Sequence, residues 1–490
     1  MAASIRSNTM RSGLSVLILA LLVWTPACVL ITLAEERPVP VEVPEKFTTT
    51  GKAKVPDRWW EAFQDEDLSR LVTEALGRNL DLKVAWSRLD QAAALARQAG
   101  AAELPEVEAL AGYGISRAKA RSPINGERST DTVKDYLVGL QVAYEVDIWG
   151  RIRSTRKAAD LDVRATKADV MSTAMMLASR VAAAWYQLVQ QKASLELLDR
   201  QLEVSRTLLD LVEMRFKQGS VSAVDVLQQR RQLEAVEAEI PLFRMRESLL
   251  EHQLAVLLGH PPARQTLEGH RTLPALPPRP ATGLPADLVR RRPDLRAAHV
   301  RMAAADQRVA ASIADRFPAL RLTGRLETGG SNTRDLFDLW LAGLAANLTA
   351  PVLDHGRRAA EVDRNRAVAE ERLHQFGQAV LTALQEVEDA LVQESRQGQY
   401  AENITRRLDL AREELRRSRE RYVNGATDYL PVLGAIQGLQ QLERQELEEK
   451  RKLLEYRIDL YRALGGGWTL ERPSPPDTDD DDTENPKPRS

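Results

Sequence analysis

The side chains that most often perform catalysis or bind metals are sparse and scattered in this sequence. Six histidines, at positions 252, 260, 270, 299, 355 and 374, show no paired ligand spacing with carboxylates. The "GGGW" segment that begins at Gly465 lacks the Lys-Ser/Thr of a phosphate-binding loop, and the sequence contains no Gly-x-Ser-x-Gly elbow. We therefore expect neither an enzyme nor a protein that holds a metal or a cofactor.

The only cysteine, Cys28, excludes an internal disulfide and directly follows a pattern typical of an export signal. Two arginines precede an apolar run over residues 14–23, as in a secretory signal peptide. Ala27 and Cys28 resemble the cleavage box of bacterial lipoproteins, in which the cysteine becomes the acylated first residue. The sequence therefore predicts a signal peptide over residues 1–27 and lipid attachment at Cys28.

An uncleaved membrane anchor is the alternative, because residues 14–34 are long enough to span a bilayer. Under either interpretation the rest of the chain is exported. A Pro-rich extended linker is expected over residues 28–58. The acidic, Pro-rich residues 471–490 predict a disordered tail.

The composition favours long helices with solvated faces. Aromatic residues make up 5% of the chain and charged residues 28%, while Ala, Leu, Arg, Glu and Gln are abundant. The 68 Lys and Arg residues against 70 Asp and Glu residues give a net charge of −2. This balance gives no basis for a nucleic acid partner.

The sequence contains an internal repeat. The segment "NLDLKVAWSRLDQ" aligns with "RPDLRAAHVRMAA" at an offset of 213 residues, and "RFKQGSVSAVDVL" aligns with "RYVNGATDYLPVL" at an offset of 206. The change of offset indicates a longer loop in the first copy. We expect two tandem repeats, over residues 59–270 and 271–470, each with the order helix, strand, loop, strand, long helix, turn, helix.

Each repeat contains segments in which apolar residues alternate with polar or small ones. Residues 136–146, 320–326 and 340–348 follow this period of two, and a weaker Gly-rich segment covers residues 107–115. The alternation predicts strands with one apolar and one polar face. Polar loops are expected between the strands of each pair, over residues 117–135 and 328–335.

Two helices of 68 residues are predicted over residues 151–218 and 357–424, each reaching about 100 Å at 1.5 Å per residue. Their later halves carry apolar residues at spacings of four and three, which is typical of a coiled-coil seam. The seam positions are Leu198, Leu202, Ser205, Leu209, Val212 and Phe216 in the first copy and Ile404, Leu408, Ala411, Leu415, Ser418 and Tyr422 in the second. Shorter helices, over about residues 68–103 and 224–258, are expected to stack end to end beside the first long helix.

A strand with one apolar face must place that face against a core or against lipid. Four strands cannot close a barrel, and an open edge in lipid leaves backbone groups unpaired. Membrane barrels begin at about eight strands, so several copies must share one wall. We therefore expect a mainly α protein with a small β part. Its four strands per protomer would contribute to a trimeric 12-stranded transmembrane β-barrel, and its long coiled-coil helices would form an α-barrel.

The duplicated plan, the opening "WWEAF" with "LSRLVTEALGRNLDL", the "RRPDLRAA" segment and the "RYVNGATDYLPVL" turn resemble the TolC superfamily of outer-membrane efflux proteins. Within it, they resemble the NodT/OprM-type lipoproteins of tripartite efflux systems, over residues 59–470. The resemblance implies a homotrimeric, passive exit duct for drugs, toxic compounds or metal ions, lipid-anchored in a Gram-negative outer membrane, with its helices in the periplasm. It also implies a periplasmic adaptor (membrane fusion) protein and an inner-membrane resistance-nodulation-division (RND) transporter as partners.

The resemblance assigns the two turns after the long helices to the periplasmic tip, where family members touch the adaptor and narrow the closed pore. It implies tip or gate roles for Gly219 and Asp225 in the first copy and for Gly425 and Asp428 in the second. The local alternative is that both glycines end helices in the left-handed conformation and that Asp225 serves its turn.

Arg321 and Arg325 lie on the polar face of a predicted strand, so they are expected to line the barrel lumen or, alternatively, to form an ordinary wet strand face. Two other functions are open at this point: a duct for type I protein secretion, and a periplasmic coiled-coil scaffold that transports nothing. The scaffold does not explain alternating strands at equivalent points of two repeats. Nothing in the sequence names the cargo, because in such systems the inner pump selects it.

Overall fold

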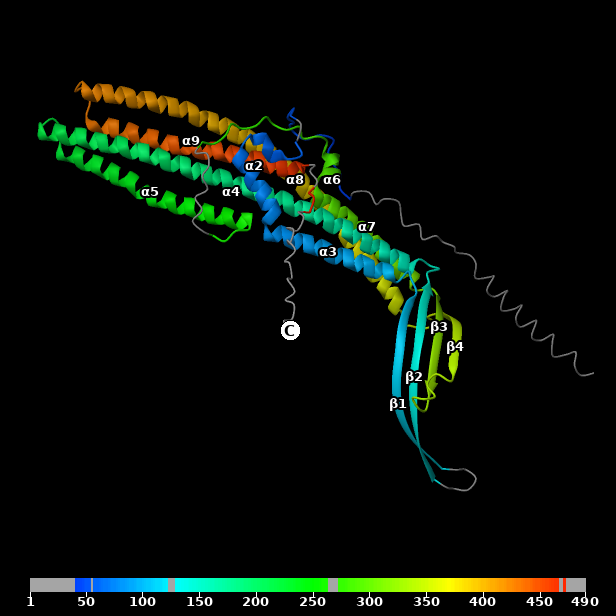
Figure 1. Cartoon of the computed structure of the whole chain (residues 1–490). Helices are drawn as coiled ribbons and strands as arrows, with labels where there is room; N and C mark the ends of the chain where they lie inside the picture. Colours follow the sequence, from blue (N-terminus) through cyan, green and yellow to red (C-terminus); the bar gives the residue numbers. More distant parts are fainter. Residues whose placement is uncertain (1–39, 54–55, 122–127, 263–271, 467–469, 473–490) are drawn as a thin grey trace, which may run out of the picture. The chain divides into compact units, whose positions relative to one another are not determined.

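The computed structural model describes residues 40–53, 56–121, 128–262, 272–466 and 470–472. The predicted signal peptide, Cys28 and nearly all of the predicted tail lie outside these residues. The described chain forms two compact units (Figure 1). One unit is drawn from residues 96–160 and 302–371 and contains the strands; the other is drawn from residues 40–95, 161–301 and 372–472 and is helical. Each unit takes residues from both predicted repeats.

The elements follow the same order in both halves of the chain. The first half contains η1 (Trp59–Phe63), α2 (Glu66–Arg78), α3 (Leu80–Ala101), β1 (Glu106–Arg121), β2 (Arg128–Val146), α4 (Arg151–Lys217) and α5 (Ala223–Leu258). The second contains η2 (Pro285–Asp287), α6 (Leu288–Arg291), α7 (Pro293–Ala314), β3 (Ala319–Gly330), β4 (Trp340–Thr349), α8 (Arg357–Val423) and α9 (Tyr429–Leu464). Helices α4 and α8 have 67 residues each, α5 and α9 have 36 each, and α3 and α7 have 22 each. These equal lengths confirm a mainly α fold built from two structural repeats.

The four strands form one antiparallel sheet in the order β1-β2-β3-β4 (Figure 1). The register places apolar residues in common rows: Leu140 pairs with Leu326, which pairs with Ala342. The next row is polar or small, because Arg325 pairs with Gln141 and with Gly343. The predicted division into an apolar face and a polar face is therefore confirmed.

The first hairpin is longer than the sequence pattern predicts. Strand β1 continues to Arg121 and β2 begins at Arg128, so most of the loop predicted over residues 117–135 is strand. The reason is that a ladder is held by backbone hydrogen bonds, which need no apolar side chains. The start of β2 also contains Thr130, Thr132 and Val133, residue types that favour strands. The second hairpin has shorter strands of 12 and 10 residues, which accounts for the change of offset between the repeats.

An aspartate caps each joint between a strand and a long helix. At the start of α4, Asp147 accepts hydrogen bonds from the backbone N–H groups of Ile152 (3.1 Å) and Arg153 (2.9 Å). At the start of α8, Asp354 accepts them from Gly356 (3.1 Å) and Arg358 (3.3 Å). These carboxylates satisfy N–H groups that have no partner inside the helix, so each strand passes directly into a helix.

The helical unit has an aromatic core at the short helix η1. Trp59 stacks on Tyr461 of α9 with ring centroids 5.8 Å apart, and Phe63 lies 5.5 Å from Tyr186 of α4. Asp65 caps α2 through the N–H of Leu68 and also accepts a hydrogen bond from Trp185 Nε1 (both 2.9 Å). Burial, together with the nearby charge of Asp65, raises the pKa of Tyr186. This core fastens η1 and α2 to one face of α4.

The single helix predicted over residues 68–103 is wrong, because the structure breaks it at Asn79 into α2 and α3. The Asn79 side chain accepts a hydrogen bond from the N–H of Leu82 (3.1 Å) and donates one to the carbonyl of Leu257 (2.9 Å). Asparagine is therefore both the end of α2 and the cap of α3, and α5 fixes its position.

Most positions of the coiled-coil seam predicted in the later halves of the two long helices are buried. Leu198, Val212, Ile404 and Leu408 are all at most 1% exposed. Leu209 and Ser418 are only partly buried, and Phe216 is 46% exposed at the end of α4, so Phe216 does not pack in the seam within one chain. Throughout the part of the chain that the structure describes, no helix has both the length and the apolar content needed to cross a membrane.

Candidate functional site: the helix tips and the polar face of the sheet

The turn between α4 and α5 is built from a glycine and a capping box. Gly219 has a positive φ of 71°, and the N–H of the next residue donates to the carbonyl of Arg215 (2.9 Å). Asp225 accepts hydrogen bonds from the N–H (2.9 Å) and the hydroxyl (2.8 Å) of Ser222, whose Oγ in turn accepts from the N–H of Asp225 (3.3 Å). Gly219 therefore ends α4 in the left-handed conformation and Asp225 caps the start of α5, as the local alternative predicts.

The turn between α8 and α9 repeats the glycine but not the capping box. Gly425 has a φ of 71°, and the N–H of Ala426 donates to the carbonyl of Arg421 (2.8 Å). Asp428 stands at the N-cap of α9 and makes no side-chain cap hydrogen bond. Its carboxylate is exposed, so it is available to a ligand or a partner where that of Asp225 is engaged.

The structure brings the two turns together through a shared buried cluster. Tyr429, at the start of α9, donates a hydrogen bond to Gln229 Oε1 of α5 (2.5 Å) and packs 5.5 Å from Tyr422 at the end of α8. The guanidinium of Arg215 lies 4.6 Å from the Tyr422 ring, a cation–π contact. Burial is the main cause that raises the pKa of Tyr429, and the negative charge of Asp225 adds to it, so the phenol stays protonated and donating.

These contacts continue along α5 and α9 as a ladder of glutamines. Gln232 donates to Gln440 Oε1 (2.9 Å) and accepts from Gln437 (2.7 Å), while Gln229 donates to the carbonyl of Ser205 (2.8 Å). Sequence reasoning did not find Gln229, Gln232 or Tyr429, because each pairs with a residue that is distant in the chain. Only Tyr429 lies close to a predicted site, four residues after Gly425, whereas Gln229 and Gln232 lie 10 and 13 residues after Gly219.

The polar face of the sheet carries paired charges. Arg321 lies opposite Glu145 in the register, with Nε 3.3 Å from Oε2, and Glu145 also binds Arg151 (2.7 Å). Arg325 lies 3.5 Å from Glu327 on the same strand. Both predicted arginines are on the polar face, as expected, but each shares its charge with a carboxylate.

The helical unit also contains buried ion pairs to which the sequence analysis assigned no role. Arg457 of α9 and Glu394 of α8, 2% and 3% exposed, join through two hydrogen bonds of 2.7 and 3.0 Å. Arg279 adds a third to the same carboxylate (2.7 Å). Burial raises the pKa of Glu394, but the hydrogen bonds and charges of the two arginines outweigh it, so the pKa is lowered overall.

Among the residues that the structure describes, no group of three or more His, Cys, Asp or Glu side chains is arranged to hold a metal ion. The contacts found at the helix ends and on the polar strand face are hydrogen bonds, ion pairs and ring contacts.

A family model described as "Outer membrane efflux protein" matches residues 71–260 and 284–466, and the chain therefore belongs to that family. It is 31% identical over 466 residues to the pyoverdine export outer membrane protein OpmQ of Pseudomonas aeruginosa, covering 91% of this chain and 96% of the relative. It is 28% identical over 441 residues to nodulation protein T of Rhizobium leguminosarum bv. trifolii, covering 88% and 92%. The solved outer-membrane channel OprN superposes with a TM-score of 0.82 at 27% identity, covering 89% of this chain and 99% of that one.

These findings confirm the resemblance and the fold class drawn from the sequence. The protein is an outer-membrane efflux component, and its family consists of outer-membrane efflux proteins rather than known enzymes. Family membership also decides against a scaffold that transports nothing.

Proposed function

We propose that three copies of this chain assemble into one passive duct through which small molecules leave the periplasm across the outer membrane. The observation that carries the proposal is the sheet, which has an exposed apolar face, a charged face and two outer strands. Every residue of β4 is exposed, and Leu344 is 95% exposed. In the described chain β1 pairs only with β2, and β4 only with β3.

Unpaired edges of this kind are not stable in lipid, because each unsatisfied backbone group costs several kcal/mol there. Copies of the chain must therefore join edge to edge. Three copies with four strands each supply twelve strands, which is above the minimum of about eight for a membrane barrel. The charged face then lines the passage, with Arg321 and Arg325 in the lumen, and the apolar face meets lipid. The long helices continue the passage as an α-barrel.

The partners in this proposal are a periplasmic adaptor protein and an inner-membrane RND transporter. The adaptor docks at the tips around Gly219 and Gly425. Asp428 is the better candidate for a contact with the adaptor, because its carboxylate is exposed and makes no cap hydrogen bond, whereas the carboxylate of Asp225 is hydrogen-bonded within its own turn. The signal peptide ends at residue 27, and an acylated Cys28 anchors the chain in the outer membrane. The transporter chooses the cargo. One relative is named as a pyoverdine export protein, so an organic molecule comparable to pyoverdine is the first candidate for the cargo.

The decisive experiment measures two properties of the purified full-length protein: its conductance in planar lipid bilayers and the mass of its complex by native mass spectrometry. We expect a stable conductance and a complex of three chains. A monomer that never conducts would contradict the proposal. Deletion of the gene separates small-molecule efflux from type I protein secretion: greater sensitivity to drugs or metals with an unchanged secreted protein profile supports efflux, and the reverse supports secretion.

A further inference from the structure

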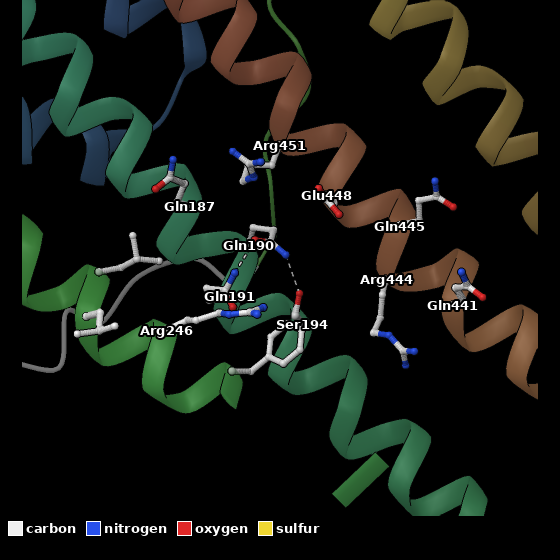
Figure 2. A pocket seen from close by; sticks show the side chains of 13 residues that line it. Gln187, Gln190, Gln191, Ser194, Arg246, Gln441, Arg444, Gln445, Glu448 and Arg451 are labelled. Carbon is white, nitrogen blue, oxygen red and sulfur yellow. Dashed lines mark hydrogen bonds between the residues drawn. The ribbon is translucent and has the colours of Figure 1, made fainter. Parts of the chain in front are cut away.

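A polar pocket of about 720 Å³ lies among α4, α5 and α9 (Figure 2). Its floor on α4 is formed by Gln190, Gln191 and Ser194, which are 8%, 9% and 1% exposed. Its remaining walls carry Arg246 of α5 and Arg444 and Arg451 of α9. Three buried polar side chains in one cavity are unusual enough to require an explanation.

The three buried groups form a hydrogen-bonded chain that ends in an unused acceptor. Gln191 Nε2 donates to Gln190 Oε1 (2.8 Å), and Gln190 Nε2 lies 3.0 Å from Ser194 Oγ, to which it donates (Figure 2). The Oε1 atom of Gln191 is buried and accepts no hydrogen bond from any residue that the structure describes. A buried acceptor of this kind is costly unless a donor reaches it, so the pocket favours a ligand with an O–H or N–H group.

The walls of the pocket are positively charged. The lining contains three arginines and one acidic residue, Glu448. Arg444 donates a hydrogen bond to Gln201 (2.9 Å) and lies 3.6 Å from the carboxylate of Glu239, and Arg451 pairs with Glu455 on its own helix. Arg246 differs from them, since within the described residues it pairs with no carboxylate and lies only over the ring of Phe243 on its own helix, at 5.4 Å. Its guanidinium is therefore free to bind an anion.

The position of the pocket on α4 indicates which way it opens. Gln187, Gln190, Gln191 and Ser194 follow the spacing i, i+3, i+4, i+7 and so share one face of the helix. Trp185 and Val189, on the opposite face, belong to the core that η1 and α2 cover. If the chain encloses a duct, η1 and α2 must lie outside it, because they would otherwise fill the passage. The pocket then faces the passage.

We propose that this pocket binds small organic anions that also carry a hydrogen-bond donor, as a subsite along the exit route. The anionic group pairs with Arg246, and the donor reaches Gln191 Oε1. The pocket belongs entirely to one chain, so binding itself does not need the assembly. Only its place along the route rests on the proposed function.

The test compares two anions on the purified full-length protein by isothermal titration calorimetry. Citrate carries three carboxylates and a hydroxyl, and tricarballylate carries the same three carboxylates without the hydroxyl. We expect the wild type to bind citrate about fivefold more tightly than tricarballylate, the difference that one net hydrogen bond makes. Gln191→Leu is expected to remove this preference, and Arg246→Gln to weaken both anions about tenfold.

Arg244→Gln is the matched control, because Arg244 is exposed on the same helix two residues away and does not line the pocket. Arg246 is exposed as well, so its substitution leaves the core intact even if Gln191→Leu fails to fold. Equal affinity for the two anions, no binding of either, or equal losses from Arg246→Gln and Arg244→Gln would each overturn the proposal. Bilayer conductance of the same samples tests the duct separately. If the wild type does not conduct, the duct is refuted, while citrate binding still decides whether the pocket binds anions.

Discussion

At the residue scale, the feature with the largest energetic consequence is the buried pair of Arg457 and Glu394. The pair joins α8 to α9, and Arg457 also donates to the carbonyl of Pro277. Because Arg279 binds the same carboxylate, the irregular segment before η2 is tied to both helices. Removing one partner of such a pair leaves an unpaired charge in the interior. The resulting loss of folding free energy is far larger than the net contribution of the intact pair.

Glu394→Gln is therefore expected to destabilise the protein by about 3 kcal/mol at neutral pH. The folded-state pKa of Glu394 is lowered from its ordinary value of 4.5, so the pair contributes stability above that pH and loses it as the pH falls through the folded-state value. Thermal unfolding followed by circular dichroism should show a large gap between wild type and variant at pH 7 that narrows in acid. Glu402→Gln, at an exposed site on the same helix, is the control, and a gap independent of pH would contradict the assignment.

The paired charges on the sheet lead to a second expectation at this scale. Glu145 lies between Arg321 and Arg151, so this group of three has one net positive charge. Arg321→Gln removes that charge, and the reversal potential in a KCl gradient should move towards the value for cations. Arg334→Gln, in the loop between β3 and β4, should have a smaller effect. An unchanged reversal potential for Arg321→Gln would mean that this strand face does not line the passage.

At the scale of elements, the two helix turns depend on the left-handed conformation of one glycine each. A Cβ built on Gly425 meets no atom within 4 Å, so the cost of adding one comes only from its φ of 71°. Gly434 is also free of neighbours, but it lies within α9 and has no positive φ. The same chemical change should therefore have opposite effects at the two positions.

Gly425→Ala is expected to destabilise the tip by about 1 kcal/mol, and Gly434→Ala to stabilise α9 by a similar amount. Hydrogen–deuterium exchange of peptides from the end of α8 and the start of α9 measures both effects. Exchange should become about fivefold faster in the first variant and slower in the second. Equal protection in both variants would show that the turn does not require the left-handed conformation.

The elements also show how far the sequence can be interpreted. The long helices and the faces of the sheet were predictable, because their periods of 3.5 and two run over many residues and appear twice. The break at Asn79 was not, since it depends on the carbonyl of Leu257, far along the chain. The same holds for Gln229 with Tyr429 and for Arg457 with Glu394: the partners lie 200 and 63 residues apart, and a single sequence carries no signal of such pairing. The predicted tip, lumen and lipid residues stay predictions until they are tested by mutation.

At the scale of the whole molecule, the assignment of the two sheet faces decides whether copies of the chain can seal a membrane. Leu344 and Ala345 are neighbours on β4, both exposed, but the register places Leu344 in a row with Gly324 and Ala345 in a row with Thr323. Leu344 thus lies on the face proposed to meet lipid, and Ala345 on the face proposed to meet water. Leu344 and Ala345 therefore allow the same substitution to be placed on either face of the sheet at nearly the same depth in the membrane.

Leu344→Arg is expected to cost about 2–4 kcal/mol in the membrane, while Ala345→Arg is expected to be tolerated. The amount of folded oligomer in outer-membrane fractions, measured by its migration on gels with and without heating, reports both. Loss of the oligomer in Leu344→Arg alone supports the assignment, because the only difference between the variants is the side of the strand that carries the charge. Equal assembly of the two, or failure of Ala345→Arg alone, would mean that the apolar face does not meet lipid, and the three-chain duct would then lose its physical basis.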